Sequence, residues 1–282
     1  MKRNIIVLGH GGQLGSELAD ISTKHNVVFV TFEEVDVTDP EALQNTLSKG
    51  WDFCINASAY TAVDLAETER EIAYKVNATA VENMAKLCNK YEIDFIHIST
   101  DYVFNGQGTR PYLEKDPTDP VNYYGESKLK GEEFALENQP NTYIIRTSWV
   151  YSTYGKNFVK TMLNLAATRT ELNVVGDQVG APTYARDLAR AIFKIIDLDN
   201  KKYGIYHYSN AGITNWAEFA QTIFDIRKLP VKVNPITTAE YPTPAKRPSY
   251  SCMNINKIQE TFGIKIPGWK TSLEEMLEKY EG

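Results

Sequence analysis

Short apolar runs and longer stretches with a helical repeat alternate along the first half of the chain. The apolar runs predict buried strands over 4–8, 27–32, 53–56, 94–99 and 142–146. Apolar residues spaced three and four apart predict helices over 13–24, 40–49, 67–91 and 121–137. Because parallel strands joined through helices form right-handed crossovers, this pattern predicts an α/β fold, a parallel sheet with helices on both faces.

The pattern changes after about residue 150. Helical spacing returns over 157–168, 185–196, 256–262 and 272–280, and 205–208 could add one more strand to the sheet. Residues 229–249 contain five prolines, which is compatible with a surface linker or with an ordered irregular segment. We favour an ordered segment, because Tyr241 and Arg247 are unusual in a spacer.

The composition limits the classes of partner. The 282 residues include 30 Lys and Arg and 36 Asp and Glu, a formal charge of −6, which argues against general attraction to nucleic acid or an anionic membrane. No apolar run approaches the roughly 20 residues of a membrane-spanning helix, and the first run is too short for a signal peptide. Three cysteines cannot form a closed set of disulfides. These features predict a reduced, cytoplasmic protein without a nucleic-acid or membrane partner.

Residues 9–15, with the sequence GHGGQLG, follow the first predicted strand and open a helix. A dinucleotide diphosphate needs backbone N–H groups at close range and the positive end of a helix, and glycine leaves room for both. The position therefore favours a cofactor loop over an ordinary turn. Asp36, after the second strand, is a candidate acceptor for the adenine or a ribose hydroxyl, whereas Asp39 suits a helix N-cap.

Two further segments at strand ends carry candidate chemistry. Small residues at 56–61 (NASAYT) would let a cofactor lie across the sheet edge, although a tight strand–loop joint explains them too. Tyr124 and Lys128 lie four apart in a predicted helix, so they share a face, and an ammonium group there would lower the pKa of the phenol. Such a pair alone is compatible with an exposed helix surface. Thr100, at the end of the preceding strand, favours a catalytic pair.

These parts, in this order, resemble the extended short-chain dehydrogenase/reductase superfamily. Five segments are similar to the dTDP-4-dehydrorhamnose reductase family, and together they extend along nearly the whole chain. They are STDYVFNG at 99–106, YYGESKLKGE at 123–132, RTSWVY at 146–151, VVGDQVGAPT at 174–183 and AKRPSYS at 245–251.

The resemblance implies a Rossmann-type doubly wound sheet with a smaller C-terminal substrate domain. The NADP(H)-binding domain would comprise 1–150 with return segments at about 186–212. The sugar-nucleotide domain would comprise 151–185 and 213–282. The implied reaction is reduction of the C4 ketone of dTDP-4-dehydrorhamnose to dTDP-L-rhamnose. A related sugar-nucleotide epimerase or reductase, or a non-catalytic NADP-binding regulatory subunit, are the alternatives.

The resemblance also implies roles for individual residues. The catalytic residues would be Thr100, Tyr124 and Lys128. The cofactor-binding residues would be Gly9, Gly12, Gln13, Leu14, Gly15, Asp36, Val37, Ala59, Tyr60, Thr61, Tyr124 and Lys128. The substrate-binding residues would be Thr100, Asp101 and Trp149, with Trp149 alternatively a core residue. We add Arg247 because a guanidinium suits phosphate oxygens, with a structural salt bridge as the alternative.

Cofactor choice and metal binding depend on nearby charge. Residues 31–34 contain two glutamates and no cation, which favours NADH, while His10 could carry positive charge near a 2′-phosphate. The resemblance implies NADPH, with NADH also accepted. Some members form homodimers bridged by a metal on glutamates. Glu17 is present here, but Arg186 stands where a further acidic residue would be useful, so we predict a possible homodimer without a metal site.

Overall fold

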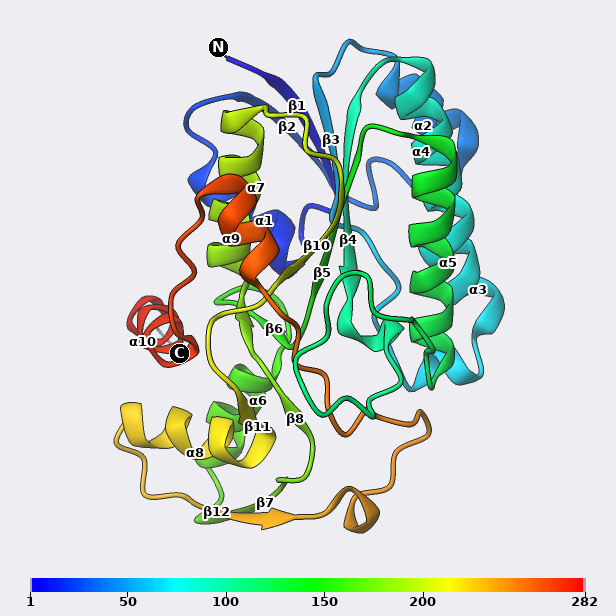
Figure 1. Cartoon of the computed structure of the whole chain (residues 1–282). Coiled ribbons are helices and arrows are strands. Elements are labelled where there is room, and N and C mark those ends of the chain that lie inside the picture. The colour runs from blue at the N-terminus through cyan, green and yellow to red at the C-terminus, as the bar shows by residue number, and fades with distance from the viewer. Residues whose placement is uncertain (1, 281–282) are drawn as a thin grey trace.

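The computed structural model describes residues 2–280, and its centre is a sheet of six parallel strands (Figure 1). The strand order is β10-β5-β4-β3-β1-β2. The strands are β1 (Asn4–Leu8), β2 (Asn26–Val30), β3 (Phe53–Asn56), β4 (Asp94–Thr100), β5 (Thr142–Thr147) and β10 (Gly204–Tyr208). The predicted doubly wound parallel sheet is confirmed, including the sixth strand.

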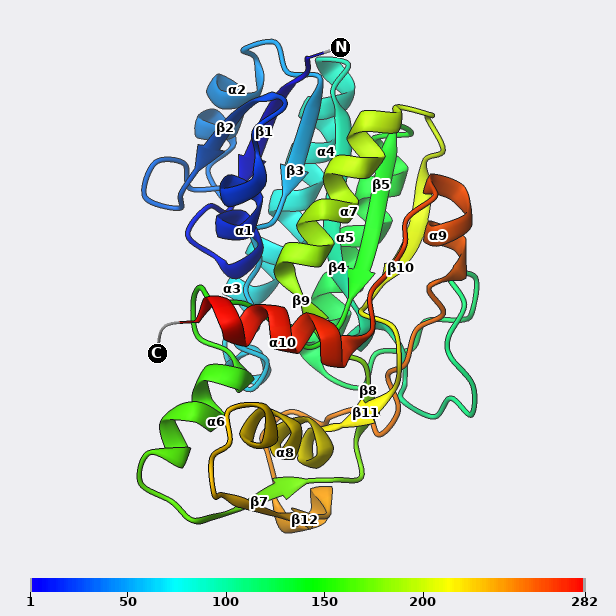
Figure 2. The same ribbon diagram turned by 90° about the vertical axis from the view of Figure 1, so that its left-hand side faces the viewer.

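Helices cover both faces of this sheet (Figures 1 and 2). One face carries α1 (Gln13–Ile21), α7 (Ala185–Leu198) and α9 (Asn256–Phe262). The other carries α2 (Pro40–Leu47), α3 (Arg70–Tyr74), α4 (Ala80–Lys90) and α5 (Tyr123–Asn138). Strand β1 shows why both faces need cover. Ile5 and Val7 belong to the first apolar cluster, whereas Ile6 and Leu8 belong to the second, as the twofold repeat of a strand requires.

Helix α5 packs closely on the loop that follows β4. The side chain of Asn122 accepts a hydrogen bond from Gly125 N at 2.8 Å, which starts the helix two residues later than the sequence predicted. A Cβ at Gly125 would lie 2.2 Å from the carbonyl oxygen of Tyr102. Glycine at this position therefore lets the first turn of α5 approach the end of β4.

The long helix predicted over 67–91 is interrupted. A 3₁₀ turn (Leu65–Glu67) and α3 come first, and a π turn (Lys75–Thr79) separates α3 from α4. The π turn holds Asn77, whose side chain accepts from Tyr60 N at 2.9 Å and donates to Ser127 Oγ at 3.0 Å. The interruption therefore ties the loop after β3 to α5, a use typical of π turns.

A smaller part of the molecule lies below the carboxyl edge of the sheet in Figure 2. Its helices are α6 (Phe158–Ala166), α8 (Trp216–Ile226) and α10 (Trp269–Lys279), and its own apolar cluster includes Phe219, Phe224 and Leu273. Three short strand pairs complete it. They are β7 (Glu171–Val175) with β12 (Lys232–Ile236), β8 (Val179–Gly180) with β11 (Thr214–Asn215), and β6 (Val150–Tyr151) with β9 (Thr183–Tyr184).

Three predictions for this part need correction. Helix α8 was missed entirely, although Asn215 caps it in the usual way. The proline-containing segment 229–249 is ordered, as expected, but it contains strand β12 and a 3₁₀ turn (Thr238–Glu240) rather than only irregular chain. Helix α9 falls in the range predicted for the smaller domain, yet Ile258 and Phe262 pack in the apolar cluster of the sheet.

Some element ends also differ from the prediction. Helix α1 ends at Ile21 rather than at residue 24, and α10 begins at Trp269 rather than at residue 272. None of the helices within residues 2–280 is long and apolar enough to cross a membrane.

Candidate active site

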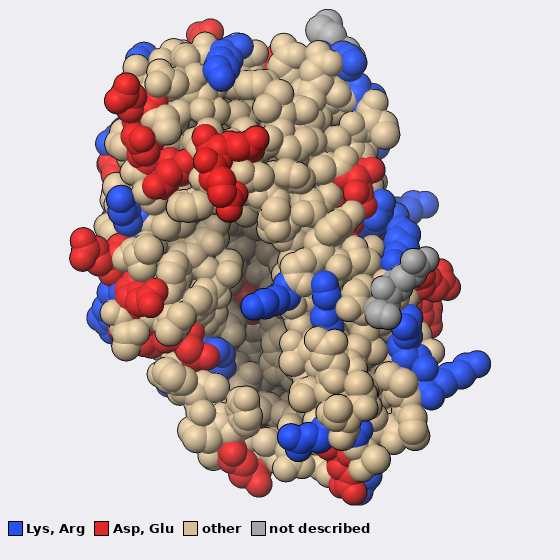
Figure 3. Space-filling view, turned by 180° about the vertical axis from the view of Figure 1, so that it is seen from behind, with Lys and Arg blue, Asp and Glu red and all other residues tan. Residues whose placement is uncertain are grey.

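A cavity of about 720 Å³ lies at the carboxyl edge of the sheet, where it meets the smaller part. Figure 3 shows the surface hollowed between the two parts, with basic side chains beside the hollow. Open α/β sheets bind ligands at this edge, and the volume lies in the usual range for small-molecule sites. Its walls include Gly12, Gln13, Leu14, Ala57, Ser58, Ala59, Thr61, Ile98, Thr100, Asp101, Tyr124 and Lys128 from the sheet side, and Ser148, Trp149, Val150, Gly155, Lys156 and Trp216 from the other side.

The glycine loop forms a cradle between β1 and α1. Gly9 has a φ of +96°, and a Cβ there would lie 2.6 Å from Ser58 N, so only glycine fits. The N-cap of α1 is Gly12, which has no side-chain cap, so the first N–H groups of the helix remain available to a ligand. Because Gly12, Gln13 and Leu14 line the cavity, this loop fits the diphosphate of a dinucleotide.

Tyr124 and Thr100 meet at the cavity wall. Burial raises the pKa of Tyr124 to about 12, and a hydrogen bond with the Thr100 side chain opposes the shift only in part. The prediction that Lys128 lowers this pKa is therefore wrong for this structure, because desolvation of the phenolate outweighs the stabilising contacts. The phenol keeps its proton at neutral pH and is hydrogen-bonded to a second hydroxyl.

Lys128 lies one helical turn beyond Tyr124 and is 1% exposed. Its Nζ donates a hydrogen bond to Ile98 O at 2.7 Å. Burial lowers the pKa of Lys128 to about 8, while the charge of Glu132 acts in the opposite direction. The lysine is thus held against β4 as an ammonium group that loses its proton slightly above neutral pH.

Glu132, which the sequence analysis did not single out, anchors this face of α5. Its carboxylate accepts from Ser99 Oγ at 2.5 Å and from Arg146 Nη2 at 2.6 Å, and both Glu132 and Arg146 are almost fully buried. Tyr124, Lys128 and Glu132 follow one another at intervals of four residues, so the helical repeat was the signal that could have identified it. The buried ion pair fixes α5 against β4 and β5.

Asp101 is the buried acid of the cavity. It is 2% exposed, and its Oδ2 atom has no hydrogen-bond partner among the described residues. Its Oδ1 accepts from Thr100 Oγ1 at 3.0 Å. Burial raises the pKa of Asp101 to about 7, although hydrogen bonds from Ser251 and Thr100 oppose the shift. One oxygen of this carboxyl is therefore buried without a partner among the described residues, next to the cavity.

The opposite wall is aromatic. The rings of Trp149 and Trp216 are stacked with centroids 3.6 Å apart, and Trp149 has a φ of +48°. Trp149 therefore lines the cavity and is not simply a core residue. Trp216 belongs to the helix that the sequence analysis missed. The apolar repeat of residues 216–226 after Asn215 was the signal available for it.

Several predicted site residues lie outside the residues that line this cavity. Val37 is buried in the apolar core, and Asp36 Oδ1 accepts from Thr38 N at 2.8 Å. Tyr60 donates its hydroxyl to Glu69 Oε2 at 2.6 Å. Gly9 and Gly15 pack against each other within the loop, since a Cβ at Gly15 would lie 2.4 Å from Gly9 O. The ring centroids of His10 and Phe29 are 5.4 Å apart. The contacts of Asp36, Val37 and His10 with the adenosine half, of Tyr60 with the nicotinamide half, and of Gly9 and Gly15 with the diphosphate stay predictions.

Arg247 forms an ion pair, the alternative considered from the sequence. Its Nη2 lies 2.9 Å from Asp64 Oδ2. Its charge nevertheless acts on Tyr102, a residue of the cavity wall. A role of Arg247 in substrate binding stays a prediction.

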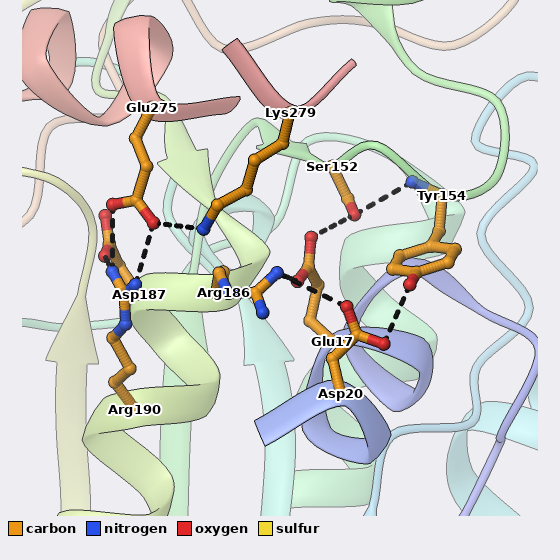
Figure 4. Close-up of polar contacts among 9 residues, drawn as sticks. All are labelled: Glu17, Asp20, Ser152, Tyr154, Arg186, Asp187, Arg190, Glu275 and Lys279. Atoms are coloured by element: carbon orange, nitrogen blue, oxygen red, sulfur yellow. Dashed lines mark hydrogen bonds and ion pairs between the residues drawn. The ribbon is translucent and has the colours of Figure 1, made fainter. Parts of the chain in front are cut away.

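The residues around Glu17 do not fit a bridging metal. Arg186 Nη1 lies 3.2 Å from Glu17 Oε2 and 3.3 Å from Asp20 Oδ2 (Figure 4). The guanidinium of Arg186 neutralises these two carboxylates, which would otherwise be free to bind a metal cation. Within residues 2–280 no group of three or more His, Cys, Asp or Glu side chains is arranged to hold a metal ion.

Comparisons with known proteins agree along nearly the whole chain. A family model described as the RmlD substrate binding domain matches residues 2–281. The chain is 41% identical to the dTDP-4-dehydrorhamnose reductase of Aggregatibacter actinomycetemcomitans, covering 96% of this chain and 97% of that protein. It is also 41% identical to the dTDP-4-dehydrorhamnose reductase of Escherichia coli K12, covering 98% and 97%. The crystal structure of dTDP-4-dehydrorhamnose reductase from Bacillus anthracis in complex with NADP superposes with a TM-score of 0.95, at 38% identity, and covers 99% of this chain and 100% of that one.

Proposed function

Because this chain belongs to the family described as the RmlD substrate binding domain, we propose that it is a dTDP-4-dehydrorhamnose reductase that uses NADPH. Its relatives carry this name at 41% identity over almost their full length, and a solved structure of the same name contains NADP. One observation in the structure carries the proposal. Thr100, Tyr124 and Lys128 line a single cavity together with the glycine loop.

The cofactor, when bound, supplies the hydride for the C4 ketone of the sugar. Tyr124 donates its proton to the oxygen of that ketone as negative charge develops there. A pKa near 12 keeps the phenol protonated at neutral pH, so it is ready to act as the acid. Thr100, whose hydroxyl lies beside Tyr124, is a second donor to the same oxygen once that hydroxyl turns away from Asp101 Oδ1. The ammonium group of Lys128 holds the ribose hydroxyls of the cofactor and keeps positive charge near the phenol.

The cofactor and the sugar nucleotide occupy different portions of the cavity. Gly12, Gln13 and Leu14 receive the cofactor diphosphate, and Ala59 and Thr61 lie beneath its nicotinamide half. Asp101 and Trp149 contact the sugar. This assignment follows the predicted division into a cofactor domain and a sugar-nucleotide domain, with α9 reassigned to the former because it packs on the sheet.

A coupled assay tests the function directly. The protein is incubated with NADPH and dTDP-4-dehydrorhamnose while absorbance is followed and the sugar product is identified. We expect one NADPH oxidised for each dTDP-L-rhamnose formed. An epimerase would recycle its cofactor and give no net oxidation. A regulatory subunit would show a higher melting temperature with NADPH but no turnover.

We also propose that the protein works in the cytoplasm and forms a homodimer. The proposed substrate, a nucleotide sugar, supports this location. Relatives named dTDP-4-dehydrorhamnose reductase act on such a substrate. Light scattering of the purified protein gives the oligomeric state, and fractionation of cells gives the location.

A further inference from the structure

The loop over residues 152–157 is fastened to helix α1 at several points (Figure 4). Ser152 Oγ donates to Glu17 Oε1 at 2.6 Å, and Tyr154 donates its hydroxyl to Asp20 Oδ1 at 2.8 Å. Asn157 Nδ2 donates to Gln13 Oε1 at 3.0 Å. Because Gln13 is the first residue of α1, the last contact holds the loop beside the end of the helix that faces the cavity.

The contacts at Glu17 make this attachment firm. Glu17 has no exposed surface, and burial raises its pKa, while Ser152 and Arg186 stabilise the carboxylate. A buried carboxylate that lost these partners would carry a large desolvation cost. The loop is therefore held in one position relative to α1.

The same loop carries Lys156 into the wall of the cavity. Lys156 lines it together with Gly12 and Gln13, and it is exposed. Within residues 2–280 none of the ion pairs involves Lys156. The lysine thus places a positive charge without an ion-pair partner among the described residues in the same cavity wall as Gly12 and Gln13.

We propose that Lys156 binds the diphosphate of the dinucleotide cofactor. The inference rests on the proposed function, which supplies the dinucleotide. The N–H groups at the start of α1 approach the diphosphate from the sheet side, and they leave oxygens facing the other wall. Lys156 pairs with those oxygens. Since its loop is fastened to α1 itself, the ammonium group and the N–H groups keep a fixed spacing around the same ligand.

Attachment to α1 favours the cofactor over the substrate as the partner of Lys156. Of the residues expected to contact the sugar, Asp101 lies on a separate segment of the cavity wall, and Trp149 precedes the loop that is fastened to α1. The diphosphate is common to NADPH and NADH. Lys156 therefore contributes to the affinity for both cofactors and does not discriminate between them.

The test measures cofactor binding without any sugar nucleotide. The Kd values of NADPH and NADH are determined by fluorescence titration for the parent protein, Lys156→Met and Lys156→Arg. Lys49→Met is the matched control, because Lys49 is an exposed lysine outside the cavity wall. We expect Lys156→Met to weaken both cofactors by about tenfold, the effect of one hydrogen bond to a charged group. Lys156→Arg should restore most of the affinity, and Lys49→Met should leave it unchanged.

Salt dependence gives a second measurement of the same contact. The Kd of the parent protein should rise more steeply with salt concentration than that of Lys156→Met, because the variant has lost one ion pair. Melting temperatures of the variants check that each is folded.

Three outcomes would overturn the assignment. Unchanged Kd values in Lys156→Met would remove Lys156 from the cofactor site. Weakening of NADPH alone would place Lys156 at the 2′-phosphate. Unchanged Kd values together with a higher KM for the sugar nucleotide, measured in the coupled assay, would place it at the substrate. A parent protein that binds neither cofactor would contradict the proposed function itself, which separates that failure from a failure of this inference.

Discussion

The two walls of the cavity are built in different ways. On the sheet side, the glycine loop follows β1 and Thr100 ends β4, while Tyr124 and Lys128 come from α5, which packs on the loop after β4. On the opposite side, the wall combines residues 147–150, which continue from β5, with Gly155, Lys156 and Trp216 from later segments of the chain. The sheet-side wall is thus a set of local motifs brought to one edge by parallel strands, whereas the other wall exists only after the smaller part has packed.

The chemistry of the two walls differs as well. Burial on the sheet side shifts the pKa of Asp101 to about 7, of Lys128 to about 8 and of Tyr124 to about 12. The opposite wall offers the stacked pair of Trp149 and Trp216 and the exposed Lys156. Proton transfer therefore belongs to the sheet-side wall, and the opposite wall contributes to binding. Substitution of the proton donor on the first wall should change kcat, and substitutions of Trp149, Trp216 or Lys156 on the second should change Kd or KM.

The largest effect should come from Tyr124→Phe. Removal of a positioned acid should lower kcat by roughly 10²–10⁴, while NADPH binding is largely retained. Tyr123→Phe is the control, because this neighbouring tyrosine does not line the cavity. Steady-state kinetics and fluorescence titration give both quantities. Near-full turnover of Tyr124→Phe at saturating substrate would show that the sheet-side wall does not hold the acid.

Lys128 should produce the alkaline side of the pH profile. Its pKa is lowered to about 8 by burial, so it loses its proton, and with it the positive charge, as the pH rises through that value. The value of kcat/KM should therefore fall above about pH 8, and the Kd of NADPH should rise over the same range. Lys128→Met should have a lower kcat and a Kd for NADPH that is about tenfold higher. Its kcat/KM should no longer fall above about pH 8. An alkaline limb that persists in Lys128→Met would assign it to another group.

Arg247→Ala tests whether binding extends beyond the cavity wall. We expect a higher KM for the sugar nucleotide, by about tenfold, with the Kd of NADPH unchanged, because a guanidinium suits the substrate diphosphate. Asp64→Asn is the comparison variant, since it breaks the ion pair but keeps the arginine. If both variants lose the same stability and neither changes KM, Arg247 serves only the ion pair.

The smallest effect should be at His10, on the adenosine side of the glycine loop. Its Nδ1 is buried and has no hydrogen-bond partner among the described residues. We expect both cofactors to be used, with a modest preference for NADPH to which the imidazole contributes as a hydrogen-bond partner of the 2′-phosphate. The ratio of the kcat/KM values for NADPH and NADH should fall in His10→Ala. A ratio that is unchanged by the substitution would make His10 an ordinary loop residue.

The sequence predicted most of the sheet and its wall of the cavity because their signals are local. Apolar runs located all six strands, and the glycine loop, Thr100 and the pair Tyr124 and Lys128 each follow or precede such a run. Once the strands are parallel, their carboxyl ends must meet at one edge, and the motifs meet with them. Periodicity could also have located α8 and Glu132, which shares a face of α5 with Tyr124 and Lys128, but both were missed.

Only the tertiary structure decided which charges meet. Arg186 pairs with Glu17 across 169 residues, and Arg247 pairs with Asp64 across 183. The direction of the pKa shift of Tyr124 also depended on burial rather than on spacing from Lys128. Such interactions depend on the distance and the solvent exposure that packing sets between remote segments. The spacing of residues along the chain contains neither the distance nor the exposure. The sequence therefore determined the motifs of the sheet-side wall, whereas the tertiary structure determined their electrostatics and the opposite wall of the cavity.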